Sequence, residues 1–472
     1  MELLLESFFR RVRDCPHDLA VESRAEASRL SFGELDARSS EWMRRLDGDP
    51  RPLAVAVGNR TAFLEIFLAA WRLGIPAVSM DASGTAAERR GLCRSLGIAR
   101  LAESPRPVAI NDSVKTDVEL STLDVEAAEP PPRTALVKLT SGSTGEPLAA
   151  CFDAAALRAG IRQIGDGMDI DAGDRVLLAL PLSHSYGFDN GLLSLLVLGT
   201  PLFLEPSVFP ADLVRGLERT QATVLPLAPP LVRSLSAARW PEKTSLRRPL
   251  CAGGVLPEAS ARGFHLASGV PVHNFYGSTE TGGICFERDP ADPQAPGSVG
   301  QPLPGVELLF DGDGRVSVRS RANLIGRWRY PTAVPGVESA AEPSTVRTGD
   351  LGQLGADGRL RLTGRVADLL NIGGRKIAAV QVESALRDLG GVRDAAVVGV
   401  PDEARGERSI AFVVADGWPL DLRSVPSRLR PRELHRVDRL PYSARGKLDR
   451  HALRARALAD HADGLVANFG VP

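Results

Sequence analysis

The sequence lacks the marks of a disulfide-rich, zinc-binding or membrane-spanning protein. Its few cysteines are scattered, without C-x-x-C or any metal-like spacing, so they predict reduced thiols. These are Cys15, Cys93, Cys151, Cys251 and Cys285. The most apolar stretch, residues 192–204, is interrupted by Gly199 and Pro201 and is shorter than the roughly 18 to 20 residues that a membrane span requires. We therefore expect no membrane span.

The sequence also has no excess charge of either sign. Its 57 basic and 58 acidic residues leave a formal net charge of -1, which gives no whole-chain case for nucleic acid or an anionic membrane as a partner. The first residues are acidic where a signal peptide has basic ones, so we expect a cytoplasmic protein. Lysine is scarce, and the chain contains only Lys115, Lys138, Lys243, Lys376 and Lys447.

What is present is enough apolar sequence for a large core. With 472 residues, 43% of them hydrophobic, the chain is long enough for several domains or subdomains. Short β-rich runs at residues 53–57, 76–80, 175–180 and 222–225 alternate with amphipathic stretches such as 60–73. This alternation predicts an α/β fold with largely parallel sheets. In such folds the functional loops leave the carboxyl ends of the strands.

The pattern changes after about residue 295. Two strand-like runs, 306–310 and 315–319, flank Asp311-Gly312-Asp313-Gly314, and Asp357-Gly358 precedes the run 359–362. Both are hairpin signals, so they predict a β-rich, barrel-like subdomain. The chain after residue 368 has β and α signals of its own, which predicts a separate small domain.

The hydroxyl-rich segment Thr140-Ser141-Gly142-Ser143-Thr144-Gly145 follows an apolar run at 135–137. Glycines let backbone amides approach an anion, and the hydroxyls add donors, so the composition suits a loop around a polyphosphate. The spacing of a Walker loop, with its lysine, is absent. Taken alone, such a segment is more often a solvated turn.

Four later clusters strengthen the polyphosphate interpretation. Residues 274–281 combine an aromatic ring, which stacks on a purine, with a carboxylate and hydroxyls, which hold Mg²⁺ on phosphates. Asp350 follows a glycine turn, where it is placed to accept from a ribose diol. Residues 364–376 contain Arg365 and a glycine pair, and residues 440–450 present Lys447 on a loop. Taken alone, each cluster is also explained as ordinary charged and polar residues of a solvent-exposed loop.

Together and in this order, the five segments closely resemble the adenylate-forming superfamily, which includes acyl- and aryl-CoA ligases, adenylation domains of peptide synthetases, and luciferases. The resemblance extends from Phe32-Gly33-Glu34-Leu35 to Lys447. It implies a large N-terminal domain of parallel-sheet αβα layers at 1–364, with the β-rich subdomain at about 295–364. A hinge at 365–368 and a small mobile α+β domain at 369–472 would follow.

The resemblance implies ATP-dependent activation of a small carboxylic acid to an acyl-adenylate, with release of pyrophosphate. It assigns the pyrophosphate end of ATP to the loop residues Thr140, Ser141, Gly142, Ser143, Thr144 and Gly145. The adenine is assigned to Gly253, Asn274 and Tyr276, with Gly277 beside them. The ribose is assigned to Asp350 and Arg365. The resemblance assigns catalysis to Thr279, to Glu280 with Mg²⁺, to Lys447 between the acid and the α-phosphate, and to His184 near the acid. The implied acid pocket comprises His184, Tyr186, Gly187, Gly254 and Gly282.

Two positions depart from the family pattern. Leu148 stands where the phosphate loop normally has lysine, which leaves a degenerate, non-catalytic acyl or nucleotide binder as an alternative. Ala367 stands where the hinge is commonly polar or charged. A hinge needs only to tolerate a backbone change, so we expect the rotation to be retained.

The family spacing places Tyr186, and not an acid, where amino-acid-activating domains have an aspartate for the substrate ammonium, and Asp189 lies three residues too late. An uncharged-tail acid, aryl or fatty, is therefore favoured, and amino-acid activation for a separate carrier protein is the alternative. Tyr186 would either bind a ring hydroxyl or wall an apolar pocket. Gly373-Gly374 would line a tunnel for the acceptor, which is CoA or the phosphopantetheine of a separate acyl carrier protein. A luciferase-like oxygenase has no feature in its favour.

Overall fold

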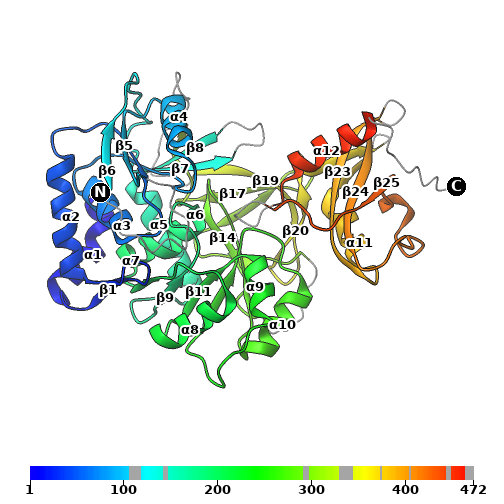
Figure 1. Cartoon of the computed structure of the whole chain (residues 1–472), viewed down its shortest axis with the longest axis horizontal. Helices are drawn as coiled ribbons and strands as arrows, with labels where there is room; N and C mark the ends of the chain where they lie inside the picture. The colour runs from blue at the N-terminus through cyan, green and yellow to red at the C-terminus, as the bar shows by residue number, and fades with distance from the viewer. Residues whose placement is uncertain are drawn as a thin grey trace. The chain divides into compact units, whose positions relative to one another are not determined.

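The computed structural model describes residues 1–105, 118–141, 147–290, 297–328, 344–372, 375–402, 406–442 and 448–462. The chain divides into two compact units (Figure 1). The first comprises Met1–Leu309 and Ser317–Val346, and the second comprises Phe310–Val316 and Arg347–Pro472.

The first unit contains two large sheets. The nine-stranded sheet has the order β15-β14-β13-β12-β11-β9-β10-β1-β2. Its strands are β1 (Leu19–Ser23), β2 (Ser28–Ser31), β9 (Val176–Leu178), β10 (Leu202–Leu204), β11 (Val224–Leu227), β12 (Arg248–Cys251), β13 (His273–Ser278), β14 (Gly282–Phe286) and β15 (Gln301–Pro302). The pairs from β1 through β10, β9, β11 and β12 to β13 are all parallel.

The seven-stranded sheet has the order β18-β8-β7-β4-β3-β5-β6. Its strands are β3 (Leu53–Ala56), β4 (Ala77–Ser79), β5 (Arg100–Glu103), β6 (Glu119–Thr122), β7 (Leu136–Ser141), β8 (Pro147–Phe152) and β18 (Gly326–Trp328). The inner strands β5, β3, β4 and β7 are parallel. Strand β3 is apolar at every position because both faces of the sheet are covered: Leu53 and Val55 join one core, and Ala54 and Ala56 join another.

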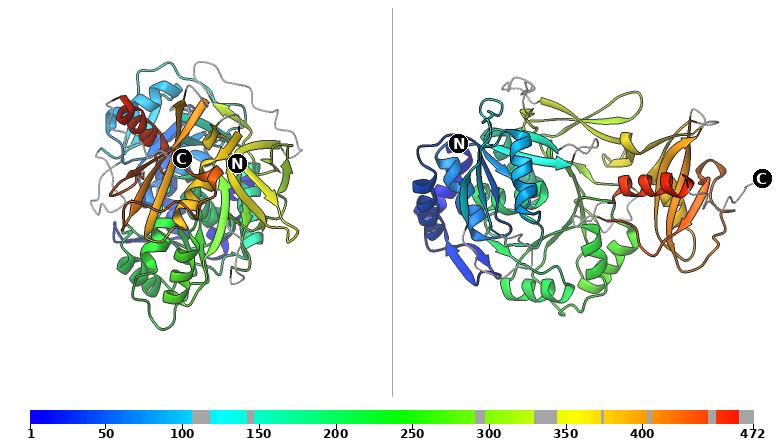
Figure 2. Two further views of the ribbon diagram at one scale, coloured as in Figure 1. Left: turned by 90° about the vertical axis from the view of Figure 1, so that its right-hand side faces the viewer. Right: turned by 45° about the horizontal axis from the view of Figure 1, so that its top comes forward.

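Helices cover both faces of each sheet (Figure 1, Figure 2). One core contains side chains from both sheets and from α1 (Glu2–Asp14), α2 (Phe32–Leu46), α3 (Thr61–Arg72), α5 (Ala154–Met168), α6 (Ser185–Phe188), the π-helical segment η1 (Asp189–Leu193) and α7 (Ser194–Val197). The other face of the nine-stranded sheet packs on α8 (Pro210–Thr220), α9 (Pro229–Leu235) and α10 (Glu258–Ser268). The other face of the seven-stranded sheet packs on α4 (Ala86–Leu96).

A four-stranded sheet follows in the β-rich stretch, with the order β16-β17-β19-β20. Its strands are β16 (Glu307–Phe310), β17 (Arg315–Ser320), β19 (Ser344–Leu354) and β20 (Leu360–Arg365). The predicted hairpin at Asp357-Gly358 is confirmed, since β19 and β20 pair antiparallel. Closure of this stretch into a barrel stays a prediction.

The second unit contains the sheet β22-β21-β24-β23, with β25 beside β24. These strands are β21 (Leu369–Ile372), β22 (Arg375–Ala378), β23 (Val392–Asp402), β24 (Gly406–Ala415) and β25 (Glu433–Arg436). Successive residues of β23 point to opposite faces. Ala395 and Val397 pack on α11 (Ala379–Arg387), and Ala396 and Val398 pack on α12 (Arg450–Ala462) (Figure 1).

The predicted fold class is confirmed: a parallel-sheet α/β body and a smaller unit of its own core. Within the predicted hinge at 365–368, the last three residues form a single 3-10 turn, η2 (Val366–Asp368). The domain boundary at 364/365 and the hinge stay predictions. Across the residues described, no helix combines the length and the apolar character that a membrane crossing needs.

Candidate active site

Loops that leave the nine-stranded sheet bring several of the predicted residues to one edge. Because β9, β11, β12 and β13 are parallel neighbours, their carboxyl ends lie at the same edge. Tyr186 and His184 follow β9, Gly253 and Gly254 follow β12, and Thr279 and Glu280 follow β13. The structure thus brings together segments up to about a hundred positions apart in the chain.

The hydroxyl-rich segment begins in the last two residues of β7, which pairs antiparallel with β8. Thr140 pairs with Leu148, and Ser141 pairs with Pro147, as the last rungs of the β7–β8 ladder. Gly142, Ser143, Thr144 and Gly145 lie outside the described residues.

The turn between β13 and β14 holds Thr279 and Glu280. The Leu324 amide donates to the Glu280 carbonyl (2.8 Å), and the Ser278 and Thr281 hydroxyls lie 3.0 Å apart, so the turn is tied down on both sides. The Glu280 side chain is half-buried. Within the described ranges no three His, Cys, Asp or Glu side chains gather into a metal site. A lone carboxylate fits Mg²⁺ that draws most of its oxygen ligands from nucleotide phosphates and water.

Strand β13 carries the two residues assigned to the adenine. Asn274 and Tyr276 are two positions apart, so they share one face of the strand. Asn274 donates to the Ser298 carbonyl (3.1 Å), and Tyr276 is buried. A Cβ on Gly277 would lie 2.4 Å from the Gly282 carbonyl oxygen. Strands β13 and β14 are therefore too close at this point for any residue other than glycine. Gly253 has φ +88°, a left-handed turn that glycine adopts at no steric cost.

Asp350 and Arg365 meet in the second unit. They are directly opposite in the β19–β20 ladder, and Arg365 Nε donates to Asp350 Oδ1 over 2.7 Å. The carboxylate is 3% exposed, whereas the guanidinium is 61% exposed. The Thr348 hydroxyl accepts from the Asp350 amide and fixes the turn before it.

Lys447 lies outside the described residues, as do Gly373 and Gly374. The two segments that flank the Lys447 loop are nevertheless paired with each other: Tyr442 and Leu448 form a β-bridge, and the Asp449 amide donates to the Pro441 carbonyl (2.8 Å). Three residues after Lys447, Arg450 binds Glu383 and lies 3.2 Å from the Asp368 carboxylate. The residue that follows the loop is therefore anchored to the predicted hinge within one unit.

The segment that precedes His184 is held by one side chain from β4 and one from the loop that follows β3. The Asn59 side chain donates to the Leu180 carbonyl and accepts from the Leu182 amide (2.8 and 2.7 Å). The Ser79 hydroxyl donates to the Ser183 carbonyl (3.1 Å). His184 then precedes the first residue of α6, half-buried at the strand edge.

Tyr186 forms a wall with an aromatic neighbour that the sequence analysis did not assign. Its ring centroid lies 5.6 Å from that of Phe275, and its hydroxyl donates to the Leu250 carbonyl (2.9 Å). Burial raises the pKa of the Tyr186 phenol well above its usual range. Because the phenol proton is already engaged, the geometry favours an apolar wall over a donor to the substrate.

A Cβ on Gly187 would lie 2.2 Å from the Pro181 oxygen, so α6 packs directly on the preceding loop.

A buried ion pair beside this wall was also missed. Lys138 Nζ lies 2.6 Å from Asp189 Oδ1, and the side chains are 5% and 9% exposed. The signal in the sequence was a single lysine inside the apolar strand Leu136–Ser141 and a single acid inside an apolar helix. Since Asp189 already has an ammonium partner, the pair speaks against its use for the ammonium of an amino-acid substrate.

Comparison with known proteins agrees with this geometry. The model of the AMP-binding enzyme family matches residues 8–318, and that of the AMP-binding enzyme C-terminal domain matches residues 381–447. Indoleacetate–CoA ligase of Aromatoleum aromaticum is 32% identical over 68% of this chain and 66% of that protein. Feruloyl-CoA synthase of an Amycolatopsis species is 27% identical over 95% of this chain and 97% of that protein.

A solved structure shares the fold across nearly the whole chain. O-succinylbenzoate coenzyme A synthetase of Bacillus subtilis, in complex with ATP and magnesium ion, has a TM-score of 0.77 at 24% identity, with 95% of this chain and 98% of that chain covered. The fold and the two matching family models thus define an adenylate-forming enzyme. This chain belongs to the AMP-binding enzyme family. The predicted enzyme class, an AMP-forming acid–thiol ligase, is confirmed.

Proposed function

We propose that this chain joins an aromatic carboxylic acid to CoA by way of an acyl-adenylate. The observation that carries the proposal is the Tyr186–Phe275 wall beside Gly187, at the strand edge where His184, Thr279 and Glu280 also lie. Flat aromatic walls with few polar groups suit an aryl substituent. The named relatives act on indoleacetate and ferulate, which are aromatic acids.

In the first half-reaction the carboxylate oxygen attacks the α-phosphorus of ATP, and pyrophosphate leaves. Two anions must approach each other, so the barrier is largely electrostatic. The β7–β8 hairpin tip would hold the pyrophosphate end, and Lys447 would lie between the carboxylate and the α-phosphate. Mg²⁺ on Glu280 would supply charge neutralisation on the phosphates.

In the second half-reaction the thiol of CoA attacks the acyl carbon, its proton leaves, and AMP departs. Asp350 and Arg365 would bind the ribose of the nucleotide through the half-reactions. Asn274 and Tyr276 would border the adenine. A rotation about residues 366–368 between the half-reactions, a carrier-protein phosphopantetheine as acceptor and a cytoplasmic location stay predictions from the sequence.

The test is ATP–pyrophosphate exchange with a panel of aryl, fatty and amino acids, followed by addition of CoA or a phosphopantetheinyl carrier protein. We expect exchange with aryl acids and thioester formation with CoA. Tyr186→Ala should lower kcat/KM for the aryl acid, and Tyr186→Phe, which keeps the ring, should preserve most of it. Exchange with amino acids alone, or with no acid, would overturn the proposal.

A further inference from the structure

The Lys138–Asp189 pair is buried, and burial disfavours the charged form of both groups. The ring centroids of Phe152 and Phe188 lie 5.1 and 5.8 Å from the Lys138 ammonium, contacts that offset part of this cost for the cation. Burial raises the pKa of Asp189, and the charge of Lys138 opposes that rise. Replacing a buried pair with apolar residues is often neutral or stabilising for a fold, so stability alone does not explain why it is here.

The local backbone is unusual at the acid. Asp189 is the first residue of η1, a π-helical segment between α6 and α7. The Ser194 hydroxyl donates to the Asp189 carbonyl (3.0 Å) and the Asn190 side chain donates to the Tyr186 carbonyl (3.0 Å), which stabilises this winding. Single π-helical turns inside helices occur frequently at functional sites.

The donors of Lys138 are incompletely used. An ammonium has three N–H donors and no acceptor. Asp189 Oδ1 accepts one of them at 2.6 Å, and the Ser185 hydroxyl accepts another at 3.2 Å. In the part of the chain that the structure describes, the third donor has no acceptor.

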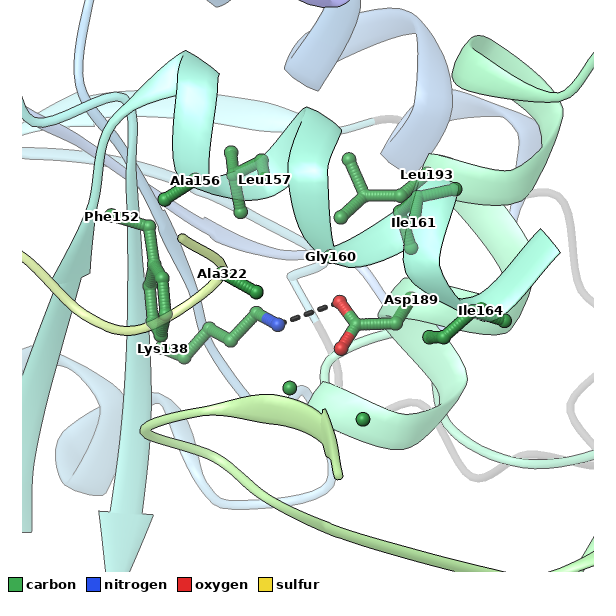
Figure 3. A pocket seen from close by; sticks show the side chains of 12 residues that line it. Lys138, Phe152, Ala156, Leu157, Gly160, Ile161, Ile164, Asp189, Leu193 and Ala322 are labelled. Carbon is green, nitrogen blue, oxygen red and sulfur yellow. Dashed lines mark hydrogen bonds and ion pairs between the residues drawn. The ribbon is translucent and has the colours of Figure 1, made fainter. Parts of the chain in front are cut away.

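The pair borders a small cavity (Figure 3). The Lys138 ammonium and the Asp189 carboxylate point toward each other among apolar side chains that include Phe152, Leu157 and Ile161 (Figure 3). The cavity volume is about 10 Å³, which is room for about one water molecule. One non-hydrogen atom of a ligand would therefore fill it.

The cavity shares Gly282 with the predicted acid pocket. Ser185, which accepts from Lys138, stands between His184 and Tyr186. Gly282 and Gly283 line the cavity, and a Cβ on Gly283 would lie 3.0 Å from the Phe275 ring that meets Tyr186. An acid whose carboxyl lies at the strand edge would thus extend its far end toward the ion pair.

We propose that the Lys138–Asp189 pair determines specificity, by selecting an aromatic acid that carries a neutral oxygen, a hydroxyl or oxo group, at the end remote from its carboxyl. This inference rests on the proposed function. The oxygen accepts from the third donor of Lys138. Asp189 balances the lysine charge, so a neutral acceptor is preferred over a second anion. An alkyl tail would bury the donor without a partner, which disfavours long-chain fatty acids.

The wild-type protein provides a test that needs no variant. Pyrophosphate exchange is measured with 4-hydroxybenzoate and 4-methylbenzoate, and with 4-hydroxycinnamate and 4-methylcinnamate, pairs that differ little in shape, and with decanoate. We expect kcat/KM for the hydroxyl acid to exceed that for the methyl acid by about tenfold or more in at least one pair, since sites built to bind a hydroxyl reject its apolar analogue. Decanoate should be a poor substrate.

The matched variant is Lys138→Met with Asp189→Leu, which removes both charges together and leaves no unpaired ion. We expect the hydroxyl-to-methyl ratio to fall toward one, because the donor to the hydroxyl oxygen is then absent. The control, Arg89→Met with Glu103→Leu, removes another buried pair of the first unit and should leave the ratio unchanged.

Three outcomes contradict the proposal. Equal rates with hydroxyl and methyl acids in the wild type would overturn this inference while aryl-acid activation stands. A ratio that survives in the double variant would show that the pair is structural. Absence of exchange with every acid would overturn the proposed function and this inference with it.

Discussion

Arg365 donates from Nε to Oδ1 of Asp350 over 2.7 Å, from the position directly opposite in the β19–β20 ladder. The exposure is unequal, because the carboxylate is 3% exposed and the guanidinium 61%. A solvated arginine thus orients a buried acid, which leaves the acid rigid. A rigid carboxylate is what recognition of a ribose diol requires, because little ordering remains to oppose binding.

Asp350→Asn tests this arrangement. The substitution keeps the shape of the side chain and removes its charge. We expect KM for ATP to rise about 10- to 100-fold, because a charge-assisted hydrogen bond contributes about 1.5 to 3 kcal/mol to binding. Steady-state pyrophosphate exchange at varied ATP measures it. The control is Asp357→Asn, at the turn of the same hairpin, where the carboxylate pairs with Arg361. An equal effect of both substitutions would contradict a ribose contact.

Lys447→Ala should remove most of the adenylation activity. Loss of one cation beside the α-phosphate lowers the rate about 10²- to 10³-fold. Thiol transfer from a supplied acyl-adenylate should be much less affected, because that step does not join two anions. Arg445→Ala, in the same loop, is the matched control. If pyrophosphate exchange in Lys447→Ala equals that of the wild type, the assigned role is wrong.

His273 should make stability fall on acidification. Its ring stacks on Phe286 at 5.1 Å, and Nδ1 donates to the Glu287 carbonyl (2.9 Å). Burial lowers the pKa of His273 below 6.5 in the folded state. As the pH falls through 6.5, His273 takes up a proton in the unfolded chain but not in the folded protein. Its contribution to the free energy of unfolding therefore decreases until the pH reaches the lowered pKa of the folded state.

His273→Phe keeps the ring and removes the titration. The free energy of unfolding, from urea titrations at pH 7.5 and pH 5.5, should change less with pH in the variant than in the wild type. The comparison uses the difference between the two proteins, because other groups contribute equally to both. An unchanged pH dependence would show that the ring titrates alike in both states.

Two glycines give opposite expectations for the same substitution. A Cβ on Gly187 would lie 2.2 Å from the Pro181 oxygen, whereas a Cβ on Gly91, within α4, meets nothing within 4 Å. Gly187→Ala should destabilise the protein by about 1 to 3 kcal/mol and lower activity with the acid. Gly91→Ala should stabilise it by about 0.5 to 1 kcal/mol. Thermal unfolding checks both, and destabilisation by both would contradict the local argument.

The architecture was accessible from the sequence because its signals are local. Apolar runs such as residues 53–57 and 175–180 have the length and composition of buried strands, and they appear as β3 (Leu53–Ala56) and β9 (Val176–Leu178). The turn Asp357-Gly358 predicted the β19–β20 hairpin through backbone preference alone. The family, too, was readable, since each motif is a short run of consecutive residues.

By itself the sequence determined the family, the α/β fold and the order of the predicted site segments. Only the tertiary structure decided which distant side chains meet. It paired Lys138 with Asp189, fifty-one positions apart, and placed Phe275 against Tyr186. The reason is physical: backbone preference and hydrophobic period act between near neighbours, whereas pocket chemistry depends on how separate strands and helices pack against one another.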